Sequence, residues 1–337
     1  MKIETNFSLK KYNTFGIEAK ATRFMDIQSE EELVEVLKAY PNDPKFILGG
    51  GSNMLLTQDI DALVLHINIK GKKIIQEDDH YVWVEGKAGE NWHEFVLWTI
   101  EQNFGGLENM SLIPGNVGTT PVQNIGAYGT EIKDTFDSCN AIRIDNQENK
   151  TFHKEECKFG YRESIFKQEA KDQYIITSVQ FKLTKNQHKI NTSYGDILKE
   201  LELQNCSNPG LKEVSNAIIA IRKRKLPDPK ELGNSGSFFK NPILSKTHFE
   251  KIQAQHPEMP HYTISDQEVK VPAGWLIEHA GFKGKRFGDA GIHVNQALVL
   301  VNYGHATGQE IVAVSKNIEK TIKELFDIEI EAEVNII

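Results

Sequence analysis

One stretch of seventeen residues constrains the fold of this chain more than any other part of its sequence. From Ile113 to Gly129 it holds four glycines, two prolines, two threonines and an adjacent amide pair. This composition excludes a regular helix or strand. Because Val117, Val122 and Ile125 are too apolar for a freely solvated tract, we expect a packed loop. Its amides and hydroxyls would suit a large planar polar ligand.

A second glycine-rich segment, residues 49–53, follows a predicted strand, residues 45–48, that is apolar from Phe46 to Leu48. Three successive glycines let backbone amides turn toward an anion, so the segment indicates a phosphate-binding turn, with an ordinary tight turn as the alternative. Met54 stands where the dinucleotide-binding fingerprint needs a further glycine, and no lysine follows as in a nucleotide-triphosphate loop. Both of those folds are therefore disfavoured.

Length, charge and cysteine content set broad limits on the protein. At about 150 residues per domain, 337 residues predict about two domains. The formal net charge of −8 disfavours nucleic acid and anionic membranes as partners. Without a long apolar run or an apolar N-terminal core, a cytoplasmic location is expected. Cys139, Cys157 and Cys206 form no CxxC pair, so we expect neither a disulfide framework nor a metal site.

The periodicity predicts mixed α and β structure. Ser29 with Glu32 predicts a helix start, and further helices are expected from about Asn91, over residues 211–225 and near residues 275–277. A long helix capped by Thr307 and Glu310 is expected near the end of the chain. Residues 328–336 alternate apolar and acidic side chains and predict one half-buried strand. The basic run 222–225 is interpreted as a solvated helix end.

Several unusual segments together resemble a known family. They are residues 13–15, 49–53, 113–129, 159–164, 225–229, 236–242, 273–277, 293–298 and 333–334. In this order they are similar to motifs of the bacterial UDP-N-acetylenolpyruvoylglucosamine reductases (UDP-N-acetylmuramate dehydrogenases), flavoproteins of the cell-wall precursor pathway. Residues 194–196 resemble the additional tyrosine loop of the type I branch of this family.

The resemblance implies an α+β fold. It consists of a vanillyl-alcohol oxidase-like FAD-binding region of two subdomains (residues 1–207) and a C-terminal substrate-binding domain (residues 208–337), with the active site between them. It also implies non-covalent FAD. The residues implied to bind it are Gly49, Gly50, Gly51, Ser52, Asn53, Pro114, Gly115, Gly118, Gln123, Asn124, Gly126, Ala127 and Tyr128.

The chemistry implied by the resemblance is a two-step reduction. NADPH reduces FAD, and hydride then passes to C3 of the enolpyruvyl group on UDP-N-acetylglucosamine, which gives UDP-N-acetylmuramate. Arg162 would hold the substrate carboxylate, Ser237 would give a proton to C2, and Glu333 would be the third catalytic residue. The residues alone leave plainer readings open. These are an arginine salt-bridged beside a strand, a serine in a turn, and one of three glutamates on a wet strand face.

The substrate contacts implied by the resemblance are Tyr161, Tyr194, Lys225, Asn241 and Gln296. Lys225 ends a predicted helix, where the helix dipole favours a cation in any case. Tyr194 stands in a Ser-Tyr-Gly-Asp loop, where a tyrosine can fold over a ligand, although an ordinary core aromatic is the alternative.

The sequence features disfavour three other functions. A sugar or alcohol oxidase of the same superfamily would use oxygen, but such relatives often attach FAD through a histidine, and neither glycine-rich segment contains one. A non-enzymatic nucleotide-binding protein would leave Arg162, Ser237 and Glu333 idle. A zinc hydrolase is disfavoured because the chain has no HExxH motif. We therefore expect a monomer that binds the UDP-sugar and NADPH but no metal, nucleic acid or membrane.

Overall fold

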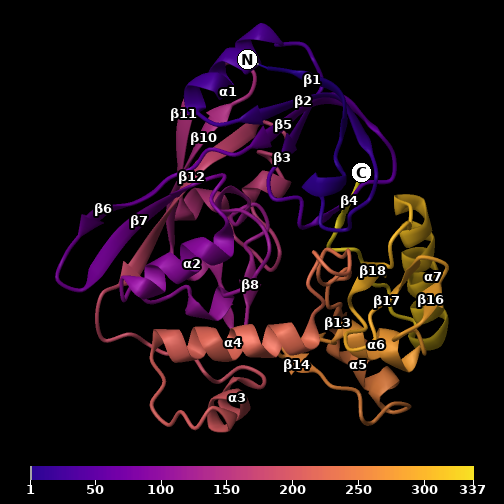
Figure 1. The fold of residues 1–337 in the computed structure, drawn as a ribbon. Helices are drawn as coiled ribbons and strands as arrows, with labels where there is room; N and C mark the ends of the chain where they lie inside the picture. The colour runs from indigo at the N-terminus through magenta and orange to yellow at the C-terminus, as the bar shows by residue number, and fades with distance from the viewer. Residues whose placement is uncertain (1) are drawn as a thin grey trace. The chain divides into compact units, whose positions relative to one another are not determined.

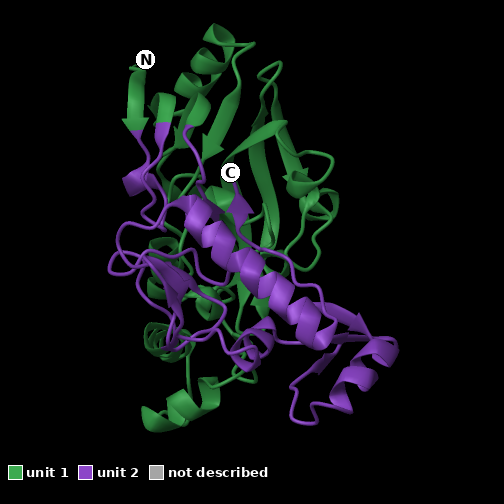
Figure 2. Ribbon diagram, turned by 90° about the vertical axis from the view of Figure 1, so that its right-hand side faces the viewer, with its two compact units in different colours: residues 1–7, 21–50, 60–224 green, residues 8–20, 51–59, 225–337 purple. Residues whose placement is uncertain are grey.

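The computed structural model describes residues 2–337, which divide into two compact units (Figure 2). Of these residues, unit 1 comprises 2–7, 21–50 and 60–224, and unit 2 comprises 8–20, 51–59 and 225–337. The predicted division of the chain into an FAD-binding region (residues 1–207) and a substrate-binding domain (residues 208–337) concerns ligand binding, and it stays a prediction.

The first sheet of unit 1 has four strands and is covered by one helix. Its order is β1 (Glu4–Ser8), β2 (Lys20–Ile27), β5 (Ile60–Ile67) and β3 (Lys45–Leu48). β2, β5 and β3 run parallel, as strands joined by a helix can. Helix α1 (Glu30–Ala39) buries Leu33 and Val36 in a shared core with this sheet. The Oγ of Ser29 accepts a hydrogen bond from the Glu32 N–H at 3.1 Å, so the predicted helix start is confirmed.

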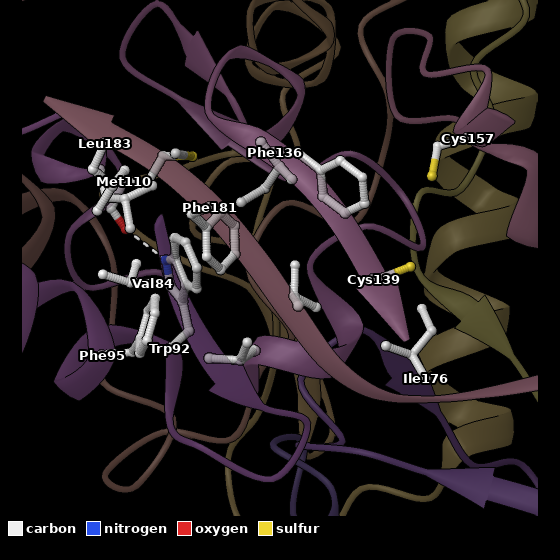
Figure 3. Close-up of a cluster of buried hydrophobic side chains, with 14 of the residues drawn as sticks. Val84, Trp92, Phe95, Met110, Phe136, Cys139, Cys157, Ile176, Phe181 and Leu183 are labelled. Atoms are coloured by element: carbon white, nitrogen blue, oxygen red, sulfur yellow. Dashed lines mark hydrogen bonds between the residues drawn. The ribbon is translucent and has the colours of Figure 1, made fainter. Parts of the chain in front are cut away.

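The second sheet of unit 1 is antiparallel and carries a large apolar core. Its order is β11 (Asn149–His153), β10 (Phe136–Arg143), β12 (Tyr174–Thr184), β7 (Tyr81–Lys87) and β6 (Lys72–Glu77) (Figure 1). Helix α2 (Trp92–Glu101) packs Trp92 and Phe95 against Phe181 of β12. The Trp92 Nε1–H donates to the Met110 carbonyl at 3.0 Å (Figure 3). This bond fixes η2 (Glu108–Met110), which leads into the loop 113–129.

The cysteines are free thiols, as the sequence predicted. Cys139 and Cys157 lie buried in the core of the second sheet (Figure 3). A contact with the Cys157 thiol, together with burial, raises the pKa of Cys139. Cys139 is therefore an unreactive packing residue at neutral pH.

A pair of helices and several short elements complete unit 1. Helix α3 (Ile197–Leu203) packs against α4 (Leu211–Lys225) through a small apolar cluster, against which Tyr128 lies part-buried. The bounds of α4 confirm the prediction for residues 211–225, whereas α3 was not predicted. The short elements are η3 (Val117–Thr119), β8 (Gly126–Ala127), β9 (Thr130–Glu131), η4 (Ile132–Asp134), η5 (Lys154–Cys157) and η6 (Ile165–Lys167).

Unit 2 is built from small sheets, three α-helices and one 3-10 helix. One sheet has the order β13 (Ile243–Ser245), β15 (Glu268–Lys270), β14 (Tyr262–Thr263). A second has the order β16 (Arg286–Phe287), β17 (Ala290–Ile292), β18 (Leu300–Asn302). The third is the parallel pair of β4 (Met54–Leu55) and β19 (Asn335–Ile336). Its helices are η1 (Lys10–Tyr12), α5 (Lys246–Gln253), α6 (Ala273–His279) and α7 (Gly308–Phe326). Thr307 and Glu310 form a reciprocal capping box at the start of α7, as predicted.

The predicted strand over residues 328–336 is wrong in extent, because only Asn335–Ile336 forms a regular strand. The preceding residues alternate in burial as expected, with Ile328, Ile330 and Val334 buried. Their hydrogen bonds go instead to the segment 238–240: the Lys240 N–H donates to Glu331 O at 2.9 Å and the Glu333 N–H to Phe238 O at 2.7 Å.

Within residues 2–337, no helix has the length and apolar character needed to cross a membrane.

Candidate active site

The loop 113–129 is pinned to the segment that joins β7 to α2. The Trp92 N–H donates to Gly115 O at 3.0 Å, and the Gly118 N–H donates to Ala88 O at the same distance. A Cβ on Gly118 would lie 2.4 Å from the Ala88 Cβ, so only glycine permits this approach. The loop is thus fixed by backbone contacts although it has almost no regular structure.

The two glycine-rich segments meet in unit 1. A Cβ on Gly49 would lie 2.4 Å from the Thr119 Cγ2, and a Cβ on Gly50 would lie 2.9 Å from the Gly115 Cα and 3.0 Å from the Asn116 Oδ1. Side chains are therefore excluded where the two backbones approach each other. This junction of two backbones without intervening side chains suits a cofactor whose phosphates are bound by backbone amides.

Arg162 stands in a tight turn. Gly160 and Glu163 exchange two backbone hydrogen bonds, at 3.0 and 3.3 Å, so Tyr161 and Arg162 occupy the tip between them. Arg162 has φ of +55°, a left-handed conformation that costs energy for a residue with a side chain. Such residues persist where the surroundings hold them in place.

Three hydrogen bonds hold this turn against the loop 113–129. They join Asn124 Nδ2 to Gly160 O at 2.9 Å, Arg162 Nη2 to Gly126 O at 3.0 Å, and Ser164 Oγ to Val122 O at 2.6 Å. The Asn124 amide also accepts from the Lys133 N–H at 3.0 Å, so this buried side chain is already used within the protein. The arginine is consequently fixed relative to the predicted cofactor loop.

Tyr128 and Tyr194 lie next to each other in unit 1. Tyr128 and Gly129 have φ of 51° and 80° and form the turn between β8 and β9. The Tyr194 ring meets the Tyr128 ring edge-on, with centroids 6.2 Å apart, and its residue is 47% exposed. The predicted tyrosine loop is therefore a loop, and it adjoins the predicted cofactor-binding segment.

Sequence reasoning missed Asn109, which joins these two loops. This buried side chain donates through Nδ2 to Tyr128 O at 3.0 Å and to Asn191 O at 2.9 Å. Its Oδ1 is buried and has no hydrogen-bond partner among residues 2–337. Only its place beside a glycine-rich loop could have drawn attention to it in the sequence.

Ser237 and Glu333 lie on adjoining extended segments of unit 2. Phe238 donates its N–H to Leu298 O at 2.8 Å and accepts from the Glu333 N–H, so the residues after Ser237 are held from both sides. Asn53 Nδ2 donates to Glu333 O at 3.3 Å. Ser237 itself is exposed at the start of this buried segment. The structure thus brings together Asn53, Ser237 and Glu333.

The motif at residues 13–15 contacts the segment that leads to Ser237. The Thr14 N–H donates to Gly51 O at 3.0 Å, and the Thr14 and Ser235 hydroxyls lie 3.1 Å apart. A Cβ on Gly51 would lie 2.0 Å from Tyr12 O, and Gly51 has φ of +59°, so glycine is needed twice over at this position. Gly51 therefore acts in packing, whatever else its segment binds.

The remaining candidates have local contacts of their own. Asn241 Oδ1 accepts from the Ala273 N–H at 2.9 Å at the start of α6, and Gln296 Oε1 accepts from the Leu298 N–H at 3.3 Å. Lys225 is the exposed last residue of α4. Pro114, Gln123, Ala127 and Ser52 lie in the two glycine-rich segments, partly or fully exposed. Arg162, Tyr161 and Tyr194 belong to unit 1, whereas Lys225, Ser237, Asn241, Gln296 and Glu333 belong to unit 2.

Comparison with known proteins defines first the class of protein and then its family. Residues 22–150 match the family described as "FAD binding domain", and residues 228–337 match "UDP-N-acetylenolpyruvoylglucosamine reductase, C-terminal domain". The chain is thus a flavoprotein, with FAD as its cofactor, and the predicted α+β class is confirmed.

Relatives over the full length identify the family. UDP-N-acetylenolpyruvoylglucosamine reductase of Flavobacterium johnsoniae is 74% identical over 100% of both chains, and that of Pseudomonas putida is 46% identical over 98% of this chain and 97% of its own. The crystal structure of the Thermus caldophilus reductase has the same fold, with a TM-score of 0.67 over 100% of this chain and 99% of its own at 22% identity. This chain belongs to the UDP-N-acetylenolpyruvoylglucosamine reductase family and is an oxidoreductase.

Gly50→Val is expected to reduce FAD binding at least about 10-fold, because a β-branched side chain would displace Gly115 or Asn116 at the junction of the two segments. Titration of apoprotein with FAD measures this change. Gly274→Ala is the matched control, because its Cβ would meet no atom closer than 3.5 Å. Unchanged FAD affinity in Gly50→Val would show that the junction does not shape the cofactor site.

Proposed function

We propose that this enzyme reduces the enolpyruvyl group of UDP-N-acetylglucosamine enolpyruvate to UDP-N-acetylmuramate, with NADPH as the source of electrons. The observation that carries the proposal is the full-length identity of 74% to a reductase of that name, together with Ser237 and Glu333 on adjoining segments of the matching C-terminal domain. We also place the enzyme in the cytoplasm as a monomer.

Bound FAD, reduced by NADPH, supplies the hydride that adds to C3 of the enolpyruvyl group. The chain's own residues then have two tasks. Negative charge develops at C2 and spreads into the adjacent carboxylate, and the Arg162 guanidinium would stabilise it through two parallel hydrogen bonds. The rigid turn that carries Arg162 supports this role, since a fixed donor needs little reorganisation as charge develops.

Ser237 would complete the reduction by giving its hydroxyl proton to C2. A serine hydroxyl is a weak acid, but the enolate-like intermediate is a strong base, so a neutral donor is adequate. The hydrogen bonds of Phe238 on both sides hold the serine segment in place. Glu333, whose N–H donates to Phe238 O, is assigned to the same proton-transfer step.

The sugar nucleotide would be bound by Tyr161, Tyr194, Lys225, Asn241 and Gln296. Lys225 provides a positive charge for the diphosphate, and its exposed position at the end of α4 supports this. Tyr194 would cover the ligand as part of a lid, consistent with its half-exposed ring on a loop.

Product formation tests this function directly. Purified enzyme is incubated with NADPH and UDP-N-acetylglucosamine enolpyruvate without oxygen, and the products are identified by mass. One equivalent of UDP-N-acetylmuramate per NADPH consumed is expected. The alternative, an oxidase of the same superfamily, predicts no such product and instead peroxide formation from oxygen with an alcohol or sugar.

Initial rates are expected to give parallel double-reciprocal lines for NADPH and the sugar nucleotide. Apart from the two segments assigned to FAD, the sequence has no second dinucleotide fingerprint, so NADPH and the sugar nucleotide would use the same face of the flavin in turn. Each substrate should also inhibit at high concentration. Intersecting lines, together with a complex of oxidised enzyme that holds both ligands, would contradict a shared site.

A further inference from the structure

Arg222, in the last turn of α4, differs from its basic neighbours. Arg224 lies at the surface and pairs with Glu200 at 2.8 Å, which fits the interpretation of residues 222–225 as a solvated helix end. Arg222 instead is part-buried: its Nε–H donates to Leu112 O at 3.2 Å, and its guanidinium interacts with the Tyr128 hydroxyl. The interpretation as a solvated end is therefore wrong for Arg222.

No carboxylate among residues 2–337 lies within ion-pair distance of Arg222. Among residues 2–337, its partners are a backbone carbonyl and a phenol hydroxyl, and no carboxylate pairs with it. The nearby His93 accepts from the Leu112 N–H through Nδ1 at 3.0 Å, and burial, with the charge of Arg222, lowers the pKa of His93. Burial also lowers the pKa of Arg222 itself. A part-buried guanidinium thus stands without a carboxylate partner among the described residues.

Such an arrangement is costly in a folded protein. A part-buried charge without an opposite charge loses hydration that no partner replaces, and such groups are often found where a ligand uses them. Leu112 and Tyr128 stand at the two ends of the loop 113–129, and both lie within residues 22–150, which match the FAD-binding domain. FAD carries a diphosphate and, when reduced, negative charge around N1 and the C2 carbonyl of its ring system.

We propose that Arg222 is an anion-binding residue of the cofactor site, and that its guanidinium pairs with a negatively charged group of bound FAD. Either the diphosphate or the reduced ring system provides that charge. The proposal concerns the cofactor alone and does not depend on which sugar nucleotide the enzyme reduces.

Stability of the apoprotein and of the FAD-loaded protein tests the proposal. In Arg222→Met, the melting temperature of the apoprotein should equal or exceed that of wild-type apoprotein, because an uncompensated charge is removed. The rise in melting temperature on addition of FAD should be smaller than in wild type. Arg224→Met removes a charge two residues away and should not change the effect of FAD. Loss of the fold, or equal destabilisation of both forms, would show a structural arginine and overturn the proposal.

Binding and redox titrations distinguish the two sources of charge. If the diphosphate is the partner, Arg222→Met should weaken binding of oxidised FAD about 10-fold or more, with the midpoint potential unchanged. If the reduced ring is the partner, oxidised FAD should bind nearly as in wild type and reduced FAD about 10-fold less tightly. That difference lowers the two-electron midpoint potential by about 30 mV. Arg222→Lys, which keeps the charge, should recover part of either loss. Wild-type affinity for both redox forms in Arg222→Met would overturn the proposal.

Discussion

In Ser237→Ala, reoxidation of the reduced enzyme by UDP-N-acetylglucosamine enolpyruvate is expected to slow by about 10²–10⁴-fold or more. Reduction of the flavin by NADPH should continue at nearly the wild-type rate. The hydroxyl of Ser237 is assigned only to proton transfer to C2, so its loss should affect only the second half-reaction. Stopped-flow absorbance of the flavin, recorded separately for each half-reaction, measures both rates.

Two further variants sharpen this test. Ser237→Cys keeps an acidic hydrogen at almost the same place and should recover part of the rate. Ser207→Ala removes an exposed hydroxyl of a residue that is not among the site candidates and should behave as wild type. Equal losses in both half-reactions of Ser237→Ala would mean that Ser237 shapes the site generally and donates no proton.

Arg162→Met should slow flavin reoxidation by the sugar nucleotide about 10²–10³-fold, the usual loss when a positioned charge donor is removed. Affinity for the sugar nucleotide should fall as well, because the carboxylate is present before the reaction begins. Arg162→Lys keeps the charge but loses the two parallel hydrogen bonds, so it should recover only part of the rate. Single-turnover reoxidation and equilibrium titration measure the two effects.

Arg143→Met is the matched control for Arg162. Arg143 is a partly exposed arginine of the same unit that pairs with Asp145 at 2.8 Å. Its loss should leave both half-reactions unchanged. If Arg162→Met reoxidised as fast as Arg143→Met, the carboxylate of the substrate would have to be stabilised by another group.

Local signals in the sequence predicted α1, α2, α4, α6 and α7 but missed the short helices α3 and α5. The caps at Ser29 and Thr307 and the apolar face of residues 211–221 depend on side chains within a few positions of each other, so the pattern contains the information. The strand over residues 328–336 failed because its hydrogen bonds go to residues about ninety positions earlier. Periodicity reports burial, which was predicted, but it does not report which segment provides the partner.

The candidate site was predictable only in part for the same reason. The glycine-rich segments announce close backbone approach, but the contact of Gly50 with Gly115 depends on tertiary structure. The association of residues 8–20 and 51–59 with the C-terminal stretch depends on contacts such as β4 with β19. Asn109 had no distinctive pattern, and Arg222 was noted only as part of a basic run, because their partners become visible only in the folded chain.

One measurement tests the central claim most directly. Enzyme-bound FAD is reduced with one equivalent of NADPH in the absence of oxygen, NADP is removed, and UDP-N-acetylglucosamine enolpyruvate is added. We expect the absorbance bands of oxidised flavin to return, with one UDP-N-acetylmuramate formed per flavin. Flavin that stays reduced until oxygen is admitted would contradict the account and would favour an oxidase.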